Sequence, residues 1–162
     1  MQSTLFLHFI TCVDHAYIDA RGNVVGGSYH PNFEVTGEVE SKENVVVDFS
    51  RVKKEIKGAI DDKARGFDHK LWIIHGLSKV SYAINDVEQT ILIQTPTTTL
   101  RMPCNAVKIF DSEWHGNMDK TFEAEANAYL TAELSKLHPD LNITVKTQNT
   151  STCFSHSAQP FM

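Results

Sequence analysis

The stretch VVVDFSRVKKEIKGAIDD, residues 45–62, joins an apolar extended run to an amphipathic segment. Residues 45–50 predict a strand, because valine and phenylalanine favour the pleated backbone. The helical spacing of apolar side chains from residue 51 onward predicts a helix over residues 51–62, with Ser50 as its N-cap and Gly66 at its end. The expected buried stripe of this helix comprises Val52, Ile56, Ala59 and Ile60. A helix with one apolar face after a strand indicates a helix packed on a sheet.

Two extended segments precede this stretch. Residues 3–11 form an apolar run typical of a strand, and residues 28–40 alternate around Phe33 and Val35, with Gly37 as a possible bulge. A polar turn over residues 41–44 then leads into the strand at 45–50. Short connections of this kind predict an antiparallel meander.

The second half of the chain alternates extended and helical patterns. Residues 67–74 predict a strand, residues 80–86 and 89–96 a hairpin around Asn85, and residues 97–103 an extension of that hairpin. A helix is expected over residues 119–138, stopped by Pro139, and a last strand over residues 142–148. The expected apolar stripe of the second helix comprises Phe122, Ala126, Tyr129, Leu130, Leu134 and Leu137.

This order of elements predicts an α+β fold in which one antiparallel four-stranded sheet carries two helices on one face. The segment between residues 74 and 102 is interpreted as an insertion remote from any chemistry. The 162 residues suffice for a single domain over residues 1–162, with partial disorder expected in the tail at 151–162.

Composition excludes several classes of function. The net charge is -5 and lysine and arginine cluster only in RVKKEIK, so we expect no nucleic-acid partner. The short apolar run at the N-terminus is interrupted by His8 and Thr11, so neither a signal peptide nor a membrane span is expected. Three widely spaced cysteines without a C-x-x-C pair favour a reduced, cytoplasmic protein.

Several of these segments together resemble the 6-pyruvoyltetrahydropterin and 6-carboxytetrahydropterin synthases of the tetrahydropterin and queuosine pathways. The resemblance lies in TLFLHF with His15 after it, FEVTGEV, VVVDFSRVKKEIKGAI, FDHKL, TFEAEANAYL and ITVKT, and it spans nearly the whole chain. It implies the tunnelling fold (T-fold), whose units form a barrel by oligomerisation, as a trimer that commonly stacks into a hexamer. It also implies a pterin or purine-like ligand at a subunit interface.

The zinc site that this resemblance implies is incomplete. Members of the family hold zinc with three histidines, one after the first strand and two in a His-Gly-His on the second. His15 matches the first, whereas an ungapped count places residues 25–27, Val-Gly-Gly, at the other positions. If the hairpin is shortened, His30 matches one histidine and its partner falls on a residue of another type. His30 also fits a surface residue with a local hydrogen bond. His15 and His30 are thus the candidate metal ligands, and we expect no bound zinc.

Two further positions depart from the family. The family's cysteine, which acts as nucleophile or base, corresponds to Arg21, and Cys12 fits a core residue better than a substitute. The family's glutamate after the last strand, which anchors the pterin, corresponds to Thr147, beside Gln148. Arg21, Thr147 and Gln148 are therefore the candidate ligand-binding residues.

The pair Asp68-His69 is the catalytic feature that the sequence keeps. In the family this pair polarises and protonates the substrate side chain, with the carboxylate holding one tautomer of the imidazole. The alternative is structural, with Asp68 capping a turn and His69 packing at the start of a strand. Asp68 and His69 are the candidate catalytic residues.

Three functions remain open from the sequence. The chain is an active carbon-oxygen lyase on dihydroneopterin triphosphate with a rearranged site, or a homo-oligomer that binds a heterocycle without the standard activity, or a structural homo-oligomer with a relic pocket. The substituted zinc, cysteine and glutamate positions favour the second of these.

Overall fold

The computed structural model describes residues 2–38, 49–139 and 141–147. Three of the predictions fall outside this part of the chain. They are the tail at 151–162, Gln148, and most of the strand over 45–50. The elements in chain order are β1 (Gln2–Leu7), β2 (Val13–Ile18), β3 (Val24–Tyr29), β4 (Pro31–Glu38), α1 (Phe49–Asp61), β5 (Lys70–Ile74), β6 (Ser81–Asn85), β7 (Thr90–Gln94), β8 (Thr99–Pro103), the 3-10 turn η1 (Cys104–Ala106), β9 (Val107–Phe110), α2 (Met118–Ser135) and β10 (Asn142–Thr147).

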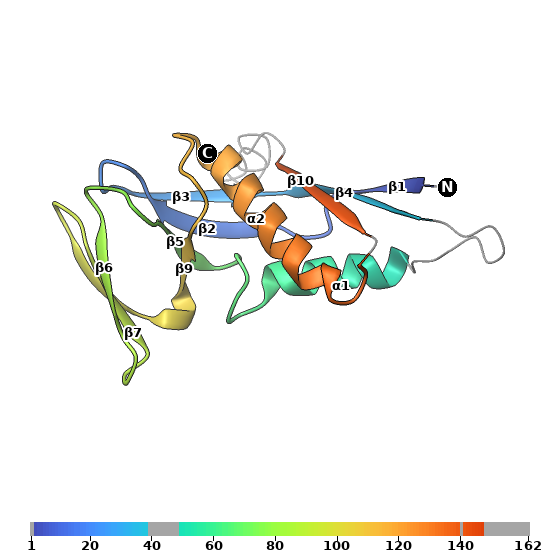
Figure 1. Ribbon diagram of the computed structural model, residues 1–162. Coiled ribbons are helices and arrows are strands. Elements are labelled where there is room, and N and C mark those ends of the chain that lie inside the picture. The colour runs from blue at the N-terminus through green and yellow to red at the C-terminus, as the bar shows by residue number, and fades with distance from the viewer. Residues whose placement is uncertain (1, 39–48, 140, 148–162) are drawn as a thin grey trace, which may run out of the picture.

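The first four strands form a long, interrupted hairpin (Figure 1). β1 pairs with β4 and β2 with β3, both antiparallel, so that Leu5 lies opposite Val35 and His15 opposite Gly27. β10 adds to the other side of β4, giving the sheet order β1-β4-β10. The predicted alternation around Phe33 and Val35 is confirmed, since both side chains are fully buried and their neighbours are not.

β5 changes the predicted topology. It pairs in parallel with β2 on one side and with β9 on the other, in a sheet of order β3-β2-β5-β9. The prediction of a single antiparallel sheet therefore differs from the structure, which has three sheets in the described residues. Every residue of β5 is buried, with Trp72 and Ile74 facing one core and Leu71 and Ile73 the other. A strand covered on both faces reads as a continuous apolar run, so its sequence does not show which strands flank it.

The first helix begins earlier and ends earlier than predicted. α1 starts at Phe49, so Ser50 lies in its first turn instead of at the N-cap. It ends at Asp61, and the side chain of Asp62 accepts the N–H groups of the following turn. Gly66 sits in that turn because a Cβ there would lie 2.3 Å from the carbonyl oxygen of Ile60. The glycine is thus required by close approach and does not end the helix.

The second helix is capped as well as amphipathic. The Asn117 side chain accepts the N–H groups of Asp119 and Lys120, at 2.8 and 3.3 Å. α2 ends at Ser135, so Leu137 falls outside the helix and is 56% exposed, contrary to prediction. The other predicted stripe positions are buried or partly buried in the main core.

Two cores flank the central strands. The main core joins both helices to one face of the long hairpin, β10 and β5, as expected for helices on one face. Figure 1 shows α1 and α2 on the same side of these strands. The second core lies between the other face of β2, β5 and β9 and the antiparallel sheet β6-β7-β8. Neither helix of the described residues is apolar enough over its length to cross a membrane.

Candidate functional site

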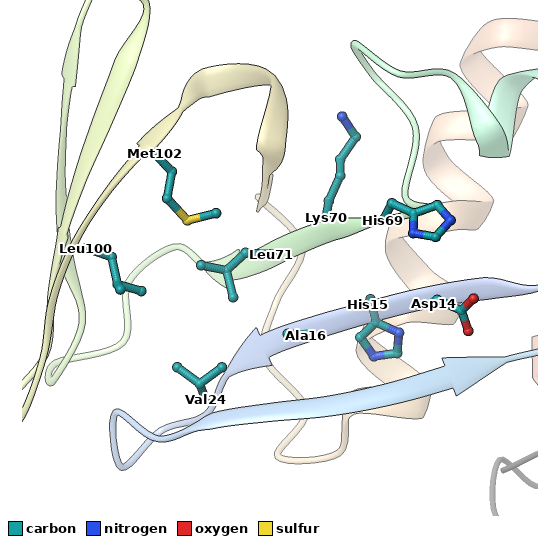
Figure 2. Close-up of a pocket in the computed structure, with 9 residues that line it drawn as sticks. All are labelled: Asp14, His15, Ala16, Val24, His69, Lys70, Leu71, Leu100 and Met102. Carbon is teal, nitrogen blue, oxygen red and sulfur yellow. The ribbon is translucent and has the colours of Figure 1, made fainter. Parts of the chain in front are cut away.

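A pocket of about 570 Å³ opens between the central sheet and β8. Its lining residues are Asp14, His15, Ala16, Val24, His69, Lys70, Leu71, Leu100 and Met102. In Figure 2, Asp14, His15 and His69 gather at one end, and the apolar side chains of Val24, Leu100 and Met102 lie toward the other. The volume and the mixture of apolar walls with a few polar groups are typical of small-molecule sites.

The pocket corrects the prediction for residues 74–102. This segment folds as β6, β7 and most of β8, and it places Leu100 and Met102 in the same pocket as His15 and His69. The insertion is therefore not remote from the candidate catalytic residues. It covers a sheet face that would otherwise be exposed and forms one wall of the pocket.

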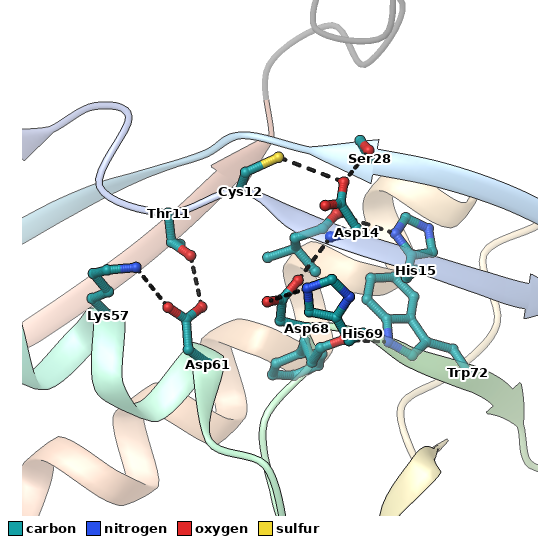
Figure 3. A network of polar contacts seen from close by, with 12 residues as sticks. Thr11, Cys12, Asp14, His15, Ser28, Lys57, Asp61, Asp68, His69 and Trp72 are labelled. Carbon is teal, nitrogen blue, oxygen red and sulfur yellow. Dashed lines mark hydrogen bonds and ion pairs between the residues drawn. The ribbon is translucent and has the colours of Figure 1, made fainter. Parts of the chain in front are cut away.

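Asp68 and His69 lie together with Asp14 at the polar end (Figure 3). The Nε2 atom of His69 is 3.4 Å from Oδ2 of Asp68. Asp68 also accepts the backbone N–H of Asp14 at 3.0 Å, and the N–H of His69 donates to the carbonyl oxygen of Asp14 at 2.7 Å. The His69 backbone has a φ of 55°, a conformation uncommon for residues other than glycine. The predicted pair is thus fixed to β2 by two backbone contacts.

Cys12 and Ser28 complete the surroundings of Asp14. The Ser28 hydroxyl donates to Oδ1 of Asp14, and the Cys12 thiol lies 3.7 Å from the same oxygen. Cys12 is only half-buried and outside the main core, so the expectation that it is a core residue is wrong. Asp14 is a site residue that the sequence analysis missed, because no motif links it to a pair 54 positions away.

His15 is enclosed by aromatic rings. Its ring stacks on Trp72 with centroids 3.7 Å apart and an interplanar angle of 3°, and on Tyr29 at 4.9 Å. Gly27 lies directly opposite, where a Cβ would come 3.2 Å from the imidazole. Burial against these rings lowers the pKa of His15 from 6.5 to about 4, so the imidazole is neutral at pH 7.

We expect stability to fall as the pH is lowered from about 7 toward 4, partly through His15. The folded-state pKa lies below the unfolded value, so in this window the unfolded chain takes up a proton that folded His15 does not. This contribution is fully present above pH 6.5 and is lost as the pH falls toward the folded-state value. Urea midpoints across this range should decline less steeply for His15→Phe, which keeps the ring but does not titrate. Equal slopes in both proteins would contradict the prediction.

The two candidate metal ligands do not meet. His15 faces Trp72 in the core, whereas His30 lies at the break between β3 and β4 with its ring edge-to-face against Phe9, at 5.6 Å. The strand register places Val13, Tyr17, Val25, Gly27 and Tyr29 on the same face of the hairpin as His15. Neither the ungapped alignment nor the shortened hairpin of the sequence analysis therefore places a second imidazole beside His15. The described residues around His15 do not fit the family's three-histidine zinc site.

A second hollow of about 220 Å³ lies on this face of the hairpin. Its lining residues include His15, Tyr29 and Asp119, and the Tyr29 hydroxyl donates to Asp119 at 2.7 Å. Burial is the main cause that raises the pKa of Tyr29, followed by its bond to Asp119, so the phenol stays protonated. The face of the hairpin where the family's zinc histidines would lie thus holds Tyr29 and Asp119, which are joined by a hydrogen bond.

The candidate ligand-binding residues are dispersed. Arg21 is exposed in the turn between β2 and β3, and it is not among the described lining residues of either pocket. Thr147 ends β10, and its N–H donates to the Glu123 carboxylate of α2 at 3.3 Å. The Glu123 carboxylate of α2 thus lies beside Thr147, the residue that matches the family's glutamate in the sequence. Its position in the helix, beside buried Phe122, gave no signal in the sequence.

Comparisons with known proteins identify the fold. No protein-family model matches the chain, and no curated protein matches it. Two solved structures of 6-pyruvoyltetrahydropterin synthase from Plasmodium vivax, both catalytic-residue mutants, are similar to it. The alanine mutant has a TM-score of 0.66 and 15% identity, covering 90% of this chain and 91% of that one. The cysteine mutant has a TM-score of 0.58 and 13% identity, with the same coverage of 90% and 91%. The chain therefore has the fold of 6-pyruvoyltetrahydropterin synthase, as the resemblance in its sequence motifs implied.

Proposed function

We propose that this chain binds a pterin or purine-like heterocycle, and that the standard synthase activity is lost or altered. The observation that carries the proposal is the pocket of about 570 Å³ with apolar walls and a polar end. A flat ring can lie between Leu71 and Met102 while Asp14 and His69 offer hydrogen bonds to its edge. The fold supports the same class of ligand, because similar structures belong to a pterin synthase.

The proposed ligand lies at a subunit interface, as the resemblance implies. The guanidine-like edge of a pterin pairs best with a carboxylate, which can accept two parallel N–H bonds. Thr147 ends β10, at the free edge of the sheet, and the Glu123 carboxylate of α2 contacts it there, where a neighbouring subunit can meet both residues. Glu123 takes over in this proposal the anchoring role that Thr147 cannot perform.

The test is to identify and quantify bound heterocycles. Mass spectrometry of the denatured protein should find a pterin or purine, and titration with a fluorescent pterin should give saturable binding. Leu100→Asp places a charge in the apolar wall and should weaken binding about tenfold or more. Val87→Lys is the matched control, because Val87 is 94% exposed on the β6–β7 turn. Absence of both copurifying and added ligand would favour a structural homo-oligomer with a relic pocket.

An active carbon-oxygen lyase is the second candidate. The observation that favours it is the Asp68–His69 pair at the pocket, fixed to Asp14. A positioned imidazole with a carboxylate partner can act as a general acid or base. Turnover of dihydroneopterin triphosphate distinguishes this function from binding alone.

We predict an assembly of three or six chains. β1 and β10 are the edges of one described sheet and β3 and β9 the edges of another, so each presents unpaired backbone groups. Closure of a barrel between subunits would pair such edges. Light scattering at micromolar concentration should give three or six times the chain mass of 18.2 kDa. A species of chain mass alone would contradict the prediction.

A further inference from the structure

Three metal-ligating side chains meet at the polar end of the pocket. Asp14, Asp68 and His69 each place one ligand atom within 4.8 Å of the other two. Asp14 comes from β2, and the other two directly precede β5, the parallel neighbour of β2. The set is thus assembled by strand pairing, and it is separate from the position of the family's three histidines.

Hydrogen bonds orient the two carboxylates of this cluster. Oδ1 of Asp68 accepts the Asp14 N–H at 3.0 Å, which leaves its Oδ2 on the side of His69. Oδ1 of Asp14 accepts the Ser28 hydroxyl, which leaves its Oδ2 available. Contacts of this kind orient metal ligands and raise their affinity.

In the part of the chain that the structure describes, no lysine or arginine balances the charge of this cluster. Among the described residues, neither Asp14 nor Asp68 forms an ion pair with lysine or arginine. Lys70 is next in the chain, but its ammonium donates to the carbonyl oxygens of Lys63 and Asn105. Figure 2 shows its side chain extending away from His15. Two neighbouring carboxylates repel each other, and a divalent cation between them removes that repulsion.

We propose that Asp14, Asp68 and His69 bind a divalent first-row transition-metal ion, represented by Zn²⁺, at the polar end of the pocket. One imidazole and two carboxylates are an accepted donor set for zinc, and three protein ligands leave a fourth position open. Zinc ligand atoms lie about 3.4 Å apart in tetrahedral geometry, so small side-chain rotations would bring these three ligand atoms to the required separations. The imidazole disfavours Mg²⁺ and Ca²⁺, which prefer all-oxygen sites. This site goes beyond heterocycle binding and does not depend on it.

The test is calorimetric titration of the full chain, freed of metal by a chelator, with Zn²⁺. One ion per chain should bind, and the affinity should fall about tenfold or more in Asp14→Asn, Asp68→Asn and His69→Gly. Glycine suits the φ of 55° at residue 69, so this variant removes the ligand without strain. Ser28→Ala should weaken binding while keeping all three ligands. The control is His75→Ala, an exposed histidine that pairs with Tyr82 outside the cluster.

Two further measurements accompany the titration, one of folding and one of ligand geometry. Far-UV circular dichroism reports whether each variant folds, and the d–d absorption of Co²⁺ reports the ligand geometry in wild type and variants. Wild type that binds no Zn²⁺ at micromolar concentration would overturn the proposal. Equal affinities in wild type, His69→Gly and Ser28→Ala would overturn it as well. Pterin titration of the metal-free protein tests the proposed function separately, so that either proposal can fail alone.

Discussion

Trp72→Ala should lower the free energy of unfolding by about 3–5 kcal/mol, the usual cost of truncating a buried tryptophan. Trp72 is fully buried at the centre of β5 and contacts rings from several elements. Its ring stacks on His15 from β2 and on Phe122 from α2, with centroids 3.7 and 5.2 Å apart. Its Nε1 donates to the carbonyl oxygen of Phe67 at 2.9 Å. The substitution therefore removes the side chain that joins the hairpin, β5 and the second helix.

Chemical denaturation followed by far-UV circular dichroism measures this effect, at one fixed protein concentration because assembly adds to apparent stability. Trp72→Phe keeps most of the ring contacts and loses the Nε1 hydrogen bond, so it should cost less than Trp72→Ala. Val87→Ala, at a site that is 94% exposed, should stay within about 0.5 kcal/mol of wild type. A loss below about 1 kcal/mol for Trp72→Ala would show that the aromatic stack is not central to the fold.

Local patterns predicted both helices and most strands, but they missed β2 and β9, did not separate β3 from β4, and predicted long-range pairing less well. The helical spacing of Val52, Ile56 and Ile60 predicts α1, and the turn residues near Asn85 predict the β6–β7 hairpin, because both signals lie within one segment. The parallel placement of β5 between β2 and β9 depends on contacts between distant segments. Its uniform apolar composition is compatible with many neighbours, so the sequence predicted a strand and not its partners.

The candidate site shows the same limit. Asp68 and His69 are adjacent in the chain and were predicted from a motif, whereas Asp14 joins them through the pairing of β2 with β5. Leu100 and Met102 reach the pocket because a separate sheet folds over β5. No spacing rule connects such residues. The contact of Glu123 with Thr147 could not be predicted for the same reason, since it joins a helix to a strand 24 positions away.

The strand register explains why the described residues opposite His15 include no second imidazole. Gly27 occupies the position opposite His15, and the space that a side chain would need there is filled by the imidazole itself. Tyr29 stacks on the same ring and donates to Asp119. His15 thus packs between aromatic side chains, burial lowers its pKa, and no second imidazole lies beside it in the described part of the chain.

The purified chain should therefore lack the standard turnover of dihydroneopterin triphosphate, even with added Zn²⁺. Without a Lewis acid at the position of His15, charge that develops on the substrate oxygens has no strong stabiliser. His69 alone could contribute roughly 10²- to 10⁴-fold as an acid or base, well short of a metal and base together. A metal ion bound to the His69 imidazole, as proposed above, would occupy one ring nitrogen and prevent proton transfer at that nitrogen. Arg21 cannot take over as base, because its pKa exceeds about 12 and it lies in the exposed β2–β3 turn.

The assay compares wild type with His69→Gly, and uses His75→Ala as the control for loss of an exposed histidine. Background turnover in all three proteins, with and without Zn²⁺, is the expected result. Robust wild-type turnover that disappears in His69→Gly and persists in His75→Ala would contradict it, and would establish the rearranged lyase.

Zn²⁺ dependence of that turnover would then separate two mechanisms. Turnover that rises with Zn²⁺ and falls in Asp14→Asn would mean that the metal at the polar end is catalytic. Turnover independent of Zn²⁺ would leave Asp68 and His69 as an acid–base pair.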